Sequence, residues 1–339
     1  MSHGRFAPRP AERERDATAT ADDGNRDVRF ADVRGALSFG TPGGGTGDAA
    51  GPSWGGHHEH PHPMREFAEA AGVPVLQPEN VNRAEALDQL RELQADVFVV
   101  AAYGQILSAE LLKIPRLGAY NLHASLLPKY RGAAPIQYAV WKGESETGVV
   151  VFRIEPRLDA GPLLGVARTP IGLDDTSGDI EQRLAAAAGP LMLSVLTDIE
   201  QGSIAPIPQD AALVSRAPKI RKEQGQIDWR QSPQEIDCQV RAMQPWPLAY
   251  TFLHVGAATP LRVVVRRVRR ASNDAGEAQS TALPGAAQAT DDGRLFVRSG
   301  AGEVEILELQ PAGKRTMTAA EFLRGRGLAA DSRFGDETE

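Results

Sequence analysis

The spacing of apolar residues between positions 64 and 200 switches repeatedly between a helical and a strand pattern. Apolar positions recur at helical spacing over 64–71 and 84–93. The segment 96–102 is an almost continuous apolar run, which is typical of a strand buried on both faces. Further elements continue the alternation: strands at 118–124 and 147–154, and helices at 134–141 and 180–199, the last with an interruption at Pro190.

Beyond residue 200 the pattern changes to short strands separated by turns. Residues 201–218 contain several prolines and little periodicity, so we expect a linker there. Ser232-Pro-Gln-Glu235 is a capping box with proline at the first helical position, which predicts a helix to about Met243. Short strands are expected at 249–254, 261–268, 294–297 and 303–309. This order predicts a small OB-like β-barrel domain over 219–330.

Residues 1–60 show neither pattern. They are rich in Gly, Ala, Asp, Arg and Pro and contain few large apolar residues. Such a composition buries too little apolar surface to offset the entropy of ordering, so we expect a disordered or aberrant amino terminus. The alternation of helices and strands predicts an α/β domain over 61–200 with a Rossmann-like, mostly parallel sheet. The linker and the barrel domain then follow.

Composition limits the classes of protein to which the chain can belong. With 42% hydrophobic and 24% charged residues among 339, it is typical of a soluble globular protein. A single cysteine, Cys238, excludes a disulfide framework and suits a reducing cytoplasm. No apolar run approaches the roughly 20 residues that a membrane span requires. We therefore expect a cytoplasmic protein that does not cross a membrane.

Charge is distributed unevenly along the chain. The formal net charge of −7 argues, on its own, against a nucleic-acid partner. Residues 215–330, however, hold 17 Lys and Arg against 12 Asp and Glu, and five arginines fall within 261–270. A basic carboxyl-terminal module is compatible with nucleic-acid binding, although a solvated basic face explains the same charges.

Polar residues gather where two of the predicted strands end. Asn121 and His123 are two positions apart on one strand, so their side chains point to the same face. Pro128 then prevents this strand from continuing as a central one. Asp159 lies in the loop after strand 147–154 and can reach the same rim, where ligands bind in open α/β sheets.

The chemistry of Asn121, His123 and Asp159 suits transfer of an acyl group to an amine. A histidine can take a proton from an amine near neutral pH, and a neighbouring carboxylate fixes its tautomer and favours its charged form. An asparagine amide donates hydrogen bonds to a developing oxyanion. No Ser or Cys nucleophile is implied, so direct transfer fits better than a covalent intermediate. A histidine between apolar residues is more often a core residue, so Asn-x-His alone is weak evidence.

Four motifs in a fixed order give a resemblance to a known family. They are Asn121-Leu-His-Ala-Ser-Leu-Leu-Pro128, Arg131-Gly-Ala-Ala-Pro-Ile-Gln137, Glu146-Thr-Gly148 and Leu158-Asp-Ala-Gly161. Together they resemble the 10-formyltetrahydrofolate-dependent formyltransferases, over about residues 61–328. The second motif, and Leu309-Gln-Pro-Ala-Gly-Lys-Arg-Thr-Met317, resemble the members that act on methionyl-tRNA.

The resemblance implies transfer of a formyl group from 10-formyltetrahydrofolate to the α-amino group of methionyl initiator tRNA, for translation initiation. It implies an OB-like module that binds the tRNA. We also expect no metal and a monomer without an obligate protein partner. By this resemblance the site residues are Asn121, His123 and Asp159 for catalysis and Ser125, Leu126, Leu127 and Pro128 for folate. The charges of Lys314 and Arg315 make them candidate phosphate contacts, and the alternative is that their segment is simply a tight turn between the last strand and helix.

Two alternatives to this function stay open. The acceptor could be the amine of a sugar nucleotide, or the chain could be a non-catalytic tRNA-binding remnant with an incomplete folate site. The second is motivated by residues 1–60, which lack the strand–turn–helix–strand with which the resembled enzymes begin. The tract His57-His-Glu-His-Pro-His62 could grip a metal. No second ligand cluster completes a tetrahedral site in the sequence, so a metal is not expected.

Overall fold

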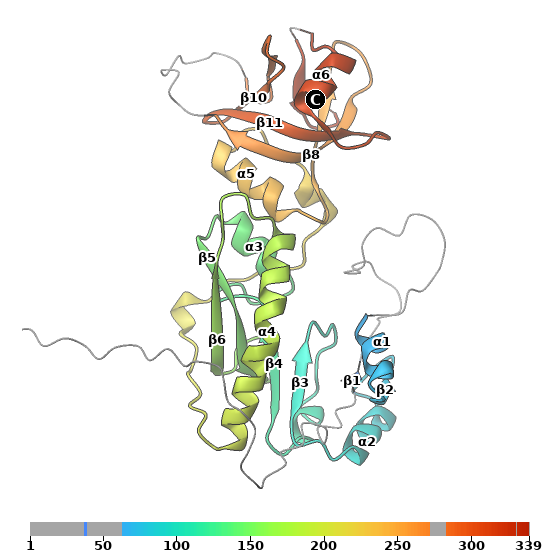
Figure 1. The fold of residues 1–339 in the computed structure, drawn as a ribbon, viewed down its shortest axis with the longest axis vertical. Helices are drawn as coiled ribbons and strands as arrows, with labels where there is room; N and C mark the ends of the chain where they lie inside the picture. The colour runs from blue at the N-terminus through green and yellow to red at the C-terminus, as the bar shows by residue number, and fades with distance from the viewer. Residues whose placement is uncertain (1–36, 39–62, 272–282, 330, 339) are drawn as a thin grey trace, which may run out of the picture.

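The computed structural model describes residues 37–38, 63–271, 283–329 and 331–338 of the 339-residue chain. Figure 1 shows an α/β half (blue to yellow-green) and a β-rich half (orange to red) stacked along the long axis of the molecule. Our expectations for residues 1–60 and for the histidine tract 57–62 fall outside the described residues, apart from 37–38.

The α/β half alternates helices and strands, and the predicted elements occur in the predicted order, but strand β6 has no predicted counterpart. Its elements are β1 (Leu37–Ser38), α1 (Pro63–Ala70), β2 (Val75–Leu76), α2 (Ala84–Glu92), β3 (Phe98–Ala101), the 3-10 helix η2 (Leu111–Lys113), β4 (Ala119–His123), α3 (Pro135–Trp141), β5 (Glu146–Arg153), β6 (Leu163–Pro170) and α4 (Ser177–Glu200). Strands β1 and β2 pair in parallel, apart from the main sheet. The predicted and observed bounds agree closely because the apolar spacing in this half is strong.

The main sheet of the α/β half has the strand order β3-β4-β5-β6. Strands β3 and β4 are parallel, whereas β5 is antiparallel to both β4 and β6. The described sheet is therefore mixed. The connection 154–162 between β5 and β6 is shorter than the dozen or so residues that a parallel crossover needs, so an antiparallel return is the only short route.

Helix α4 is continuous through Pro190, so the predicted interruption at this proline is wrong. The helix begins with a capping box in which Thr176 and Asp179 satisfy each other's backbone N–H groups. It buries Leu184 before the proline and Val195 after it, against β5 and β6, while Pro190 itself is exposed. Packing on both sides of Pro190 outweighs the roughly 3 kcal/mol that a proline costs inside a helix.

The β-rich half is a nearly closed antiparallel barrel preceded by a helix, as predicted. Its elements are η3 (Ala211–Leu213), η4 (Lys222–Gly225), α5 (Pro233–Ala242), β7 (Ala249–His254), β8 (Leu261–Arg270), β9 (Ala287–Ala289), β10 (Leu295–Ser299), β11 (Gly302–Pro311), β12 (Met317–Thr318), α6 (Ala319–Gly325) and β13 (Arg333–Gly335). The strand order is β13-β7-β8-β11-β10-β9, with β12 on β11. A bridge between Ala286 and Arg333 brings the two ends of this order together.

Helices α3 and α5 join the two halves. They pack against each other, and Ala242 of α5 is buried together with Val140 of α3 and Ile180 of α4. Cys238, also on α5, is buried, as free cysteines commonly are. Of the helices described, none is long and apolar enough to cross a bilayer.

Candidate active site

His123 is the last residue of β4, and its imidazole is almost entirely buried. The Nε2 atom lies 2.9 Å from the carbonyl oxygen of Tyr130, and the ring packs edge-on against Phe152. A carbonyl oxygen can only accept a hydrogen bond, so Nε2 carries the proton. In the neutral ring this leaves the Nδ1 lone pair available to take a proton.

Asp159 approaches His123 from the loop between β5 and β6, as predicted. Its Oδ2 atom lies 3.9 Å from Nδ1 of His123 and accepts a hydrogen bond of 2.8 Å from the backbone N–H of Gly132. The Asp159 side chain is only 9% exposed. Its backbone has φ +47°, a left-handed conformation that costs a non-glycine residue on the order of 1 kcal/mol. The surrounding loop therefore has to hold this carboxylate in place.

Burial and charge act in opposite directions on His123. Burial lowers the pKa of His123 below its ordinary value, while the negative charge of Asp159 and the carbonyl of Tyr130 raise it. The guanidinium of Arg131 adds a smaller lowering effect. The net pKa shift is downward, which keeps the imidazole neutral, and hence able to accept a proton, at neutral pH.

Asn121 lies two residues before His123 on the same strand, between Val100 of β3 and Phe152 of β5. Its Oδ1 atom is buried, and no described protein group donates a hydrogen bond to it. A buried acceptor without a donor costs about 1–3 kcal/mol, which a bound amine or amide N–H would recover. The other side of the same carboxamide can donate to an oxyanion.

The loop Ser125–Pro128 follows β4 directly, and its four residues divide into two kinds. Ser125 is fully buried and donates a hydrogen bond of 2.7 Å to the carbonyl of Lys129, and Leu127 is buried beside Phe152. Leu126 and Pro128 are half-buried. Of the four predicted folate contacts, Leu126 and Pro128 are thus the side chains with surface to offer, while Ser125 and Leu127 fix the loop.

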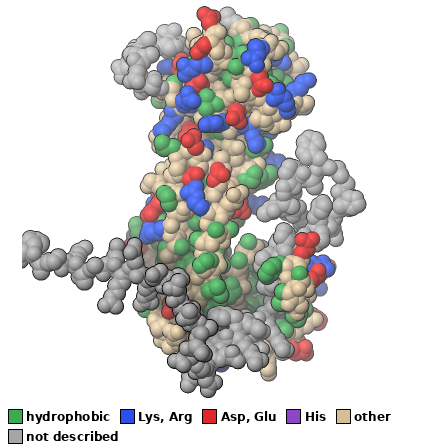
Figure 2. All heavy atoms as spheres, in the orientation of Figure 1, with side chains coloured by type: hydrophobic (Ala, Val, Ile, Leu, Met, Phe, Trp, Pro, Cys, Tyr) green, Lys and Arg blue, Asp and Glu red, His purple; other side chains and the backbone are tan. Residues whose placement is uncertain are grey.

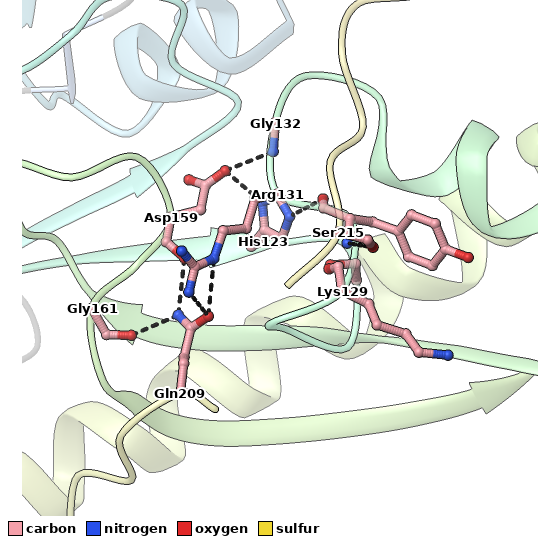
Figure 3. Close-up of polar contacts among 10 residues, drawn as sticks. His123, Lys129, Arg131, Gly132, Asp159, Gly161, Gln209 and Ser215 are labelled. Atoms are coloured by element: carbon pink, nitrogen blue, oxygen red, sulfur yellow. Dashed lines mark hydrogen bonds and ion pairs between the residues drawn. The ribbon is translucent and has the colours of Figure 1, made fainter. Parts of the chain in front are cut away.

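Residues that the sequence reasoning did not select complete the surroundings of the site. Ser215 accepts a hydrogen bond from the N–H of Tyr130 at 2.9 Å, and Gln209 contacts both Arg131 and the Asp159 loop. Figure 3 shows these side chains arranged around His123. They lie more than 50 positions from His123 in the sequence, and no local pattern links them to it. Gly132 is different, because its φ of +128° favours glycine and the residue type is therefore itself a signal in the sequence.

The two predicted phosphate contacts, Lys314 and Arg315, have different surroundings. Arg315 forms an ion pair of 2.8 Å with Glu321 and also donates to the carbonyl of Thr316. Lys314 is exposed at the turn after β11, where its carbonyl accepts a hydrogen bond from Gln310. No group of three or more His, Cys, Asp or Glu side chains suited to a metal occurs among the described residues.

Both halves of the chain match family models. Residues 48–196 match the model described as "Formyl transferase", and residues 219–327 match "Formyl transferase, C-terminal domain". Two curated relatives, both named methionyl-tRNA formyltransferase, come from Rhodopirellula baltica and Geobacillus thermodenitrificans. The first is 45% identical over 80% of this chain and 81% of its own length, and the second 38% identical over 82% and 85%.

Solved structures share the fold at lower identity. The sugar 3N-formyl transferase WlaRD, solved in the presence of dTDP and 5-N-formyl-THF, aligns with a TM-score of 0.54 at 19% identity, over 74% of this chain and 82% of its own. HypX from Aquifex aeolicus, in complex with tetrahydrofolic acid, gives 0.52 at 18% identity, over 77% and 44%. These two likenesses concern the fold alone. From the two family models and the identities to the curated relatives, this chain belongs to the formyl transferase family.

Proposed function

We propose that the protein transfers the formyl group of 10-formyltetrahydrofolate to the α-amino group of methionine on initiator tRNA. The observation that carries this proposal is the pairing of His123 with Asp159. A buried imidazole, held by Tyr130 in the tautomer that leaves Nδ1 free, faces a carboxylate across 3.9 Å. The relatives named methionyl-tRNA formyltransferase support the choice of acceptor, because they match both halves of the chain.

Each member of the trio has a defined part in the transfer. Nδ1 of His123 accepts the proton that the methionyl ammonium loses, and Asp159 then stabilises the imidazolium. The free amine attacks the formyl carbon, and the Asn121 amide donates to the oxyanion that forms. As the new C–N bond is completed, the bond from the formyl carbon to N10 breaks. The proton held by His123 passes to N10. The attacking nitrogen, which still carries two protons, loses one of them to the His123 that has become neutral again, and His123 releases it to solvent, so protons and electrons balance.

The folate donor is proposed to lie along the loop Ser125–Pro128. Leu126 and Pro128 offer apolar surface to the pteridine ring, and the rigid placement of Ser125 and Leu127 keeps that surface in one conformation. The loop leads directly from His123, so a donor bound there has its formyl carbon near the trio. Titration of the purified protein with tetrahydrofolate tests this proposal: micromolar binding supports it, and no binding favours the non-catalytic remnant.

The β-rich half is proposed to hold the acceptor arm of the tRNA. Figure 2 shows blue Lys and Arg side chains spread over this half, with red Asp and Glu among them. Several arginines of β8 have partners in the barrel: Arg262 lies over the ring of Tyr250, and Arg269 forms an ion pair with Glu305. Lys314 and Arg315 remain our proposed phosphate contacts. No single residue of this half is assigned to base recognition.

The assay that tests the proposal measures formylated product with initiator methionyl-tRNA and with an amino-sugar nucleotide in competition. We expect formyl-methionyl-tRNA to be the main product. Preferential formylation of the sugar amine would replace the proposed acceptor, and no product with either would favour the remnant. We also propose that the active protein is a cytoplasmic monomer. Sedimentation of the purified chain tests its oligomeric state.

A further inference from the structure

Gln209 contacts two loops of the candidate active site at once, although it belongs to the stretch 201–218 that we expected to be a linker. Its Nε2 atom donates to the carbonyl oxygens of Asp159 at 2.9 Å and Gly161 at 2.7 Å. Its Oε1 atom accepts from Nε of Arg131 at 3.2 Å and from Nη2 at 2.7 Å. The carboxamide thus has both donors and both acceptor sites in use.

The orientation of this carboxamide is set by its partners. Two carbonyl oxygens face one end of it, and a guanidinium, which has only donors, faces the other. A flipped amide would place donor against donor and acceptor against acceptor. Figure 3 shows Gln209 between the Arg131 guanidinium and the loop that carries Asp159 and Gly161.

The backbone before Gln209 is also fixed. Ile207 and Leu163 exchange two backbone hydrogen bonds of 2.8 Å, so this stretch runs alongside the start of β6. Further along, Ser215 accepts the N–H of Tyr130 through its side chain and that of Arg131 through its carbonyl. The segment between the two halves is therefore tied to the active-site loops on both sides of Gln209.

The loop that Gln209 contacts has a backbone that is both strained and tightly packed. Asp159 has the left-handed φ of +47°, and a Cβ on Gly161 would lie 1.8 Å from the carbonyl oxygen of Arg153. The hydrogen bonds from Gln209 to the two carbonyls of this loop offset the cost of that conformation. They hold the loop in the conformation in which the Asp159 carboxylate faces His123.

Gln209 also keeps Arg131 directed away from the Asp159 carboxylate. The charges of Arg131 and Asp159 attract each other, yet no ion pair joins them among the described residues, and the guanidinium bonds to Gln209 instead. A direct bond from Arg131 to Asp159 would compete with the Gly132 N–H and with His123 for the same oxygens. Gln209 leaves Oδ2 to Gly132 and His123.

We propose that Gln209 is a positioning residue for the transfer step: its carboxamide fixes the Asp159 loop and Arg131 together, and so places the Asp159 carboxylate opposite Nδ1 of His123. The inference deepens the proposed formyl transfer and depends on that function for its kinetic readout only. The charged groups that act on His123 are Asp159, which raises its pKa, and Arg131, which lowers it. Gln209 sets the position of both.

The test replaces Gln209 with methionine, which keeps the length of the side chain and removes its hydrogen bonds. With Asp159 less firmly held and Arg131 free to approach its carboxylate, the pKa of His123 should fall further below its ordinary value. NMR titration of ring-labelled histidines reads this pKa directly, with the His123 signals identified by their loss in His123→Asn. This measurement does not require catalysis, so it stands even if formyl transfer itself fails.

Kinetics give the second readout. In Gln209→Met the kcat should fall about tenfold or more with KM for either substrate nearly unchanged, because Asp159 would be less well placed to stabilise the charged form of His123 while the binding surfaces stay intact. The acidic limb of the kcat profile, which reports deprotonation of His123, should move to lower pH. A lower fraction of folded protein would reduce kcat without moving that limb.

Gln239→Met is the matched control. Gln239 also donates to two backbone carbonyls, those of Gln224 and Gln226, but in the β-rich half. It should lower thermal stability without changing the His123 pKa or the acidic limb. If Gln209→Met does not fold, Gln209→Asn, which is too short to reach all four partners, gives the same two readouts. A folded Gln209 variant with an unchanged His123 pKa and an unchanged acidic limb would overturn the proposal.

Discussion

Nδ1 of His123 lies 3.9 Å from Oδ2 of Asp159, beyond an ordinary hydrogen bond but within range of a strong charge interaction. The same Oδ2 is held at 2.8 Å by the N–H of Gly132. In the neutral ring Nδ1 carries no proton, so no hydrogen bond is due before the reaction. Once Nδ1 accepts a proton, the pair becomes an ion pair in a buried setting. The spacing suits a base that is neutral at rest and stabilised when charged.

Replacing Asp159 with asparagine tests this relationship. The variant keeps the shape of the side chain but removes the charge that raises the pKa of His123, so that pKa should fall further. We expect kcat to drop by about 10²-fold or more and the acidic limb of the pH profile to move to lower pH. Steady-state kinetics over a range of pH measure both. A limb that moves to higher pH would contradict the assigned direction of the Asp159 effect.

His123 should also contribute a pH dependence to stability. Burial lowers its folded-state pKa below the ordinary value, so between those two pKa values the unfolded chain binds more protons than the native state. The stability that neutral His123 contributes is therefore complete above the unfolded-state pKa, and it is lost as pH falls through the folded-state pKa.

Urea unfolding of wild type and of His123→Gln, from about pH 7.5 down to about pH 5, isolates this contribution. The difference in unfolding free energy between the two should shift against the wild type as pH falls. A difference that is constant, or that shifts in favour of the wild type, would count against a lowered pKa.

Gly132 should not tolerate a side chain. Its φ is +128°, and a Cβ would lie 2.5 Å from the backbone carbonyl oxygen of Ala217. Gly132→Ala should therefore destabilise the protein by about 1–3 kcal/mol and reduce activity, since the Gly132 N–H positions Asp159. Gly313→Ala is the control, because Gly313 has φ +70° with no atom within 4 Å of its Cβ position. If thermal melts show the same loss of stability for both substitutions, the contact with Ala217 is unimportant.

Replacing Pro190, in contrast to Gly132, should make the protein more stable. It lies exposed inside the continuous helix α4, where proline removes a backbone hydrogen bond. Pro190→Ala should stabilise the protein by about 1–2 kcal/mol, less than the full helix-interior penalty because proline also restricts the unfolded chain. Chemical denaturation measures the change, and a destabilised variant would indicate that the helix depends on the proline ring.

Local patterns in the sequence predict much of this molecule. The two-residue period of a strand places Asn121 and His123 on one face, and the order of strands places Asp159 at the same rim. The contributions of Gln209 and Ser215 could not be predicted, because they depend on the segment between the halves folding back over loops far away in sequence. Helix α4 shows a second limit: sequence preference at Pro190 is local, whereas the packing that overrides it is not.

The most direct test of the account is single-turnover formyl transfer to initiator methionyl-tRNA by the wild type and by His123→Ala and Asn121→Ala, with saturating 10-formyltetrahydrofolate. We predict rapid transfer by the wild type. In each variant we predict a loss of about 10²-fold or more, with tRNA binding retained. Wild-type rates in both variants would contradict the roles assigned to these two side chains, and with them the proposed mechanism.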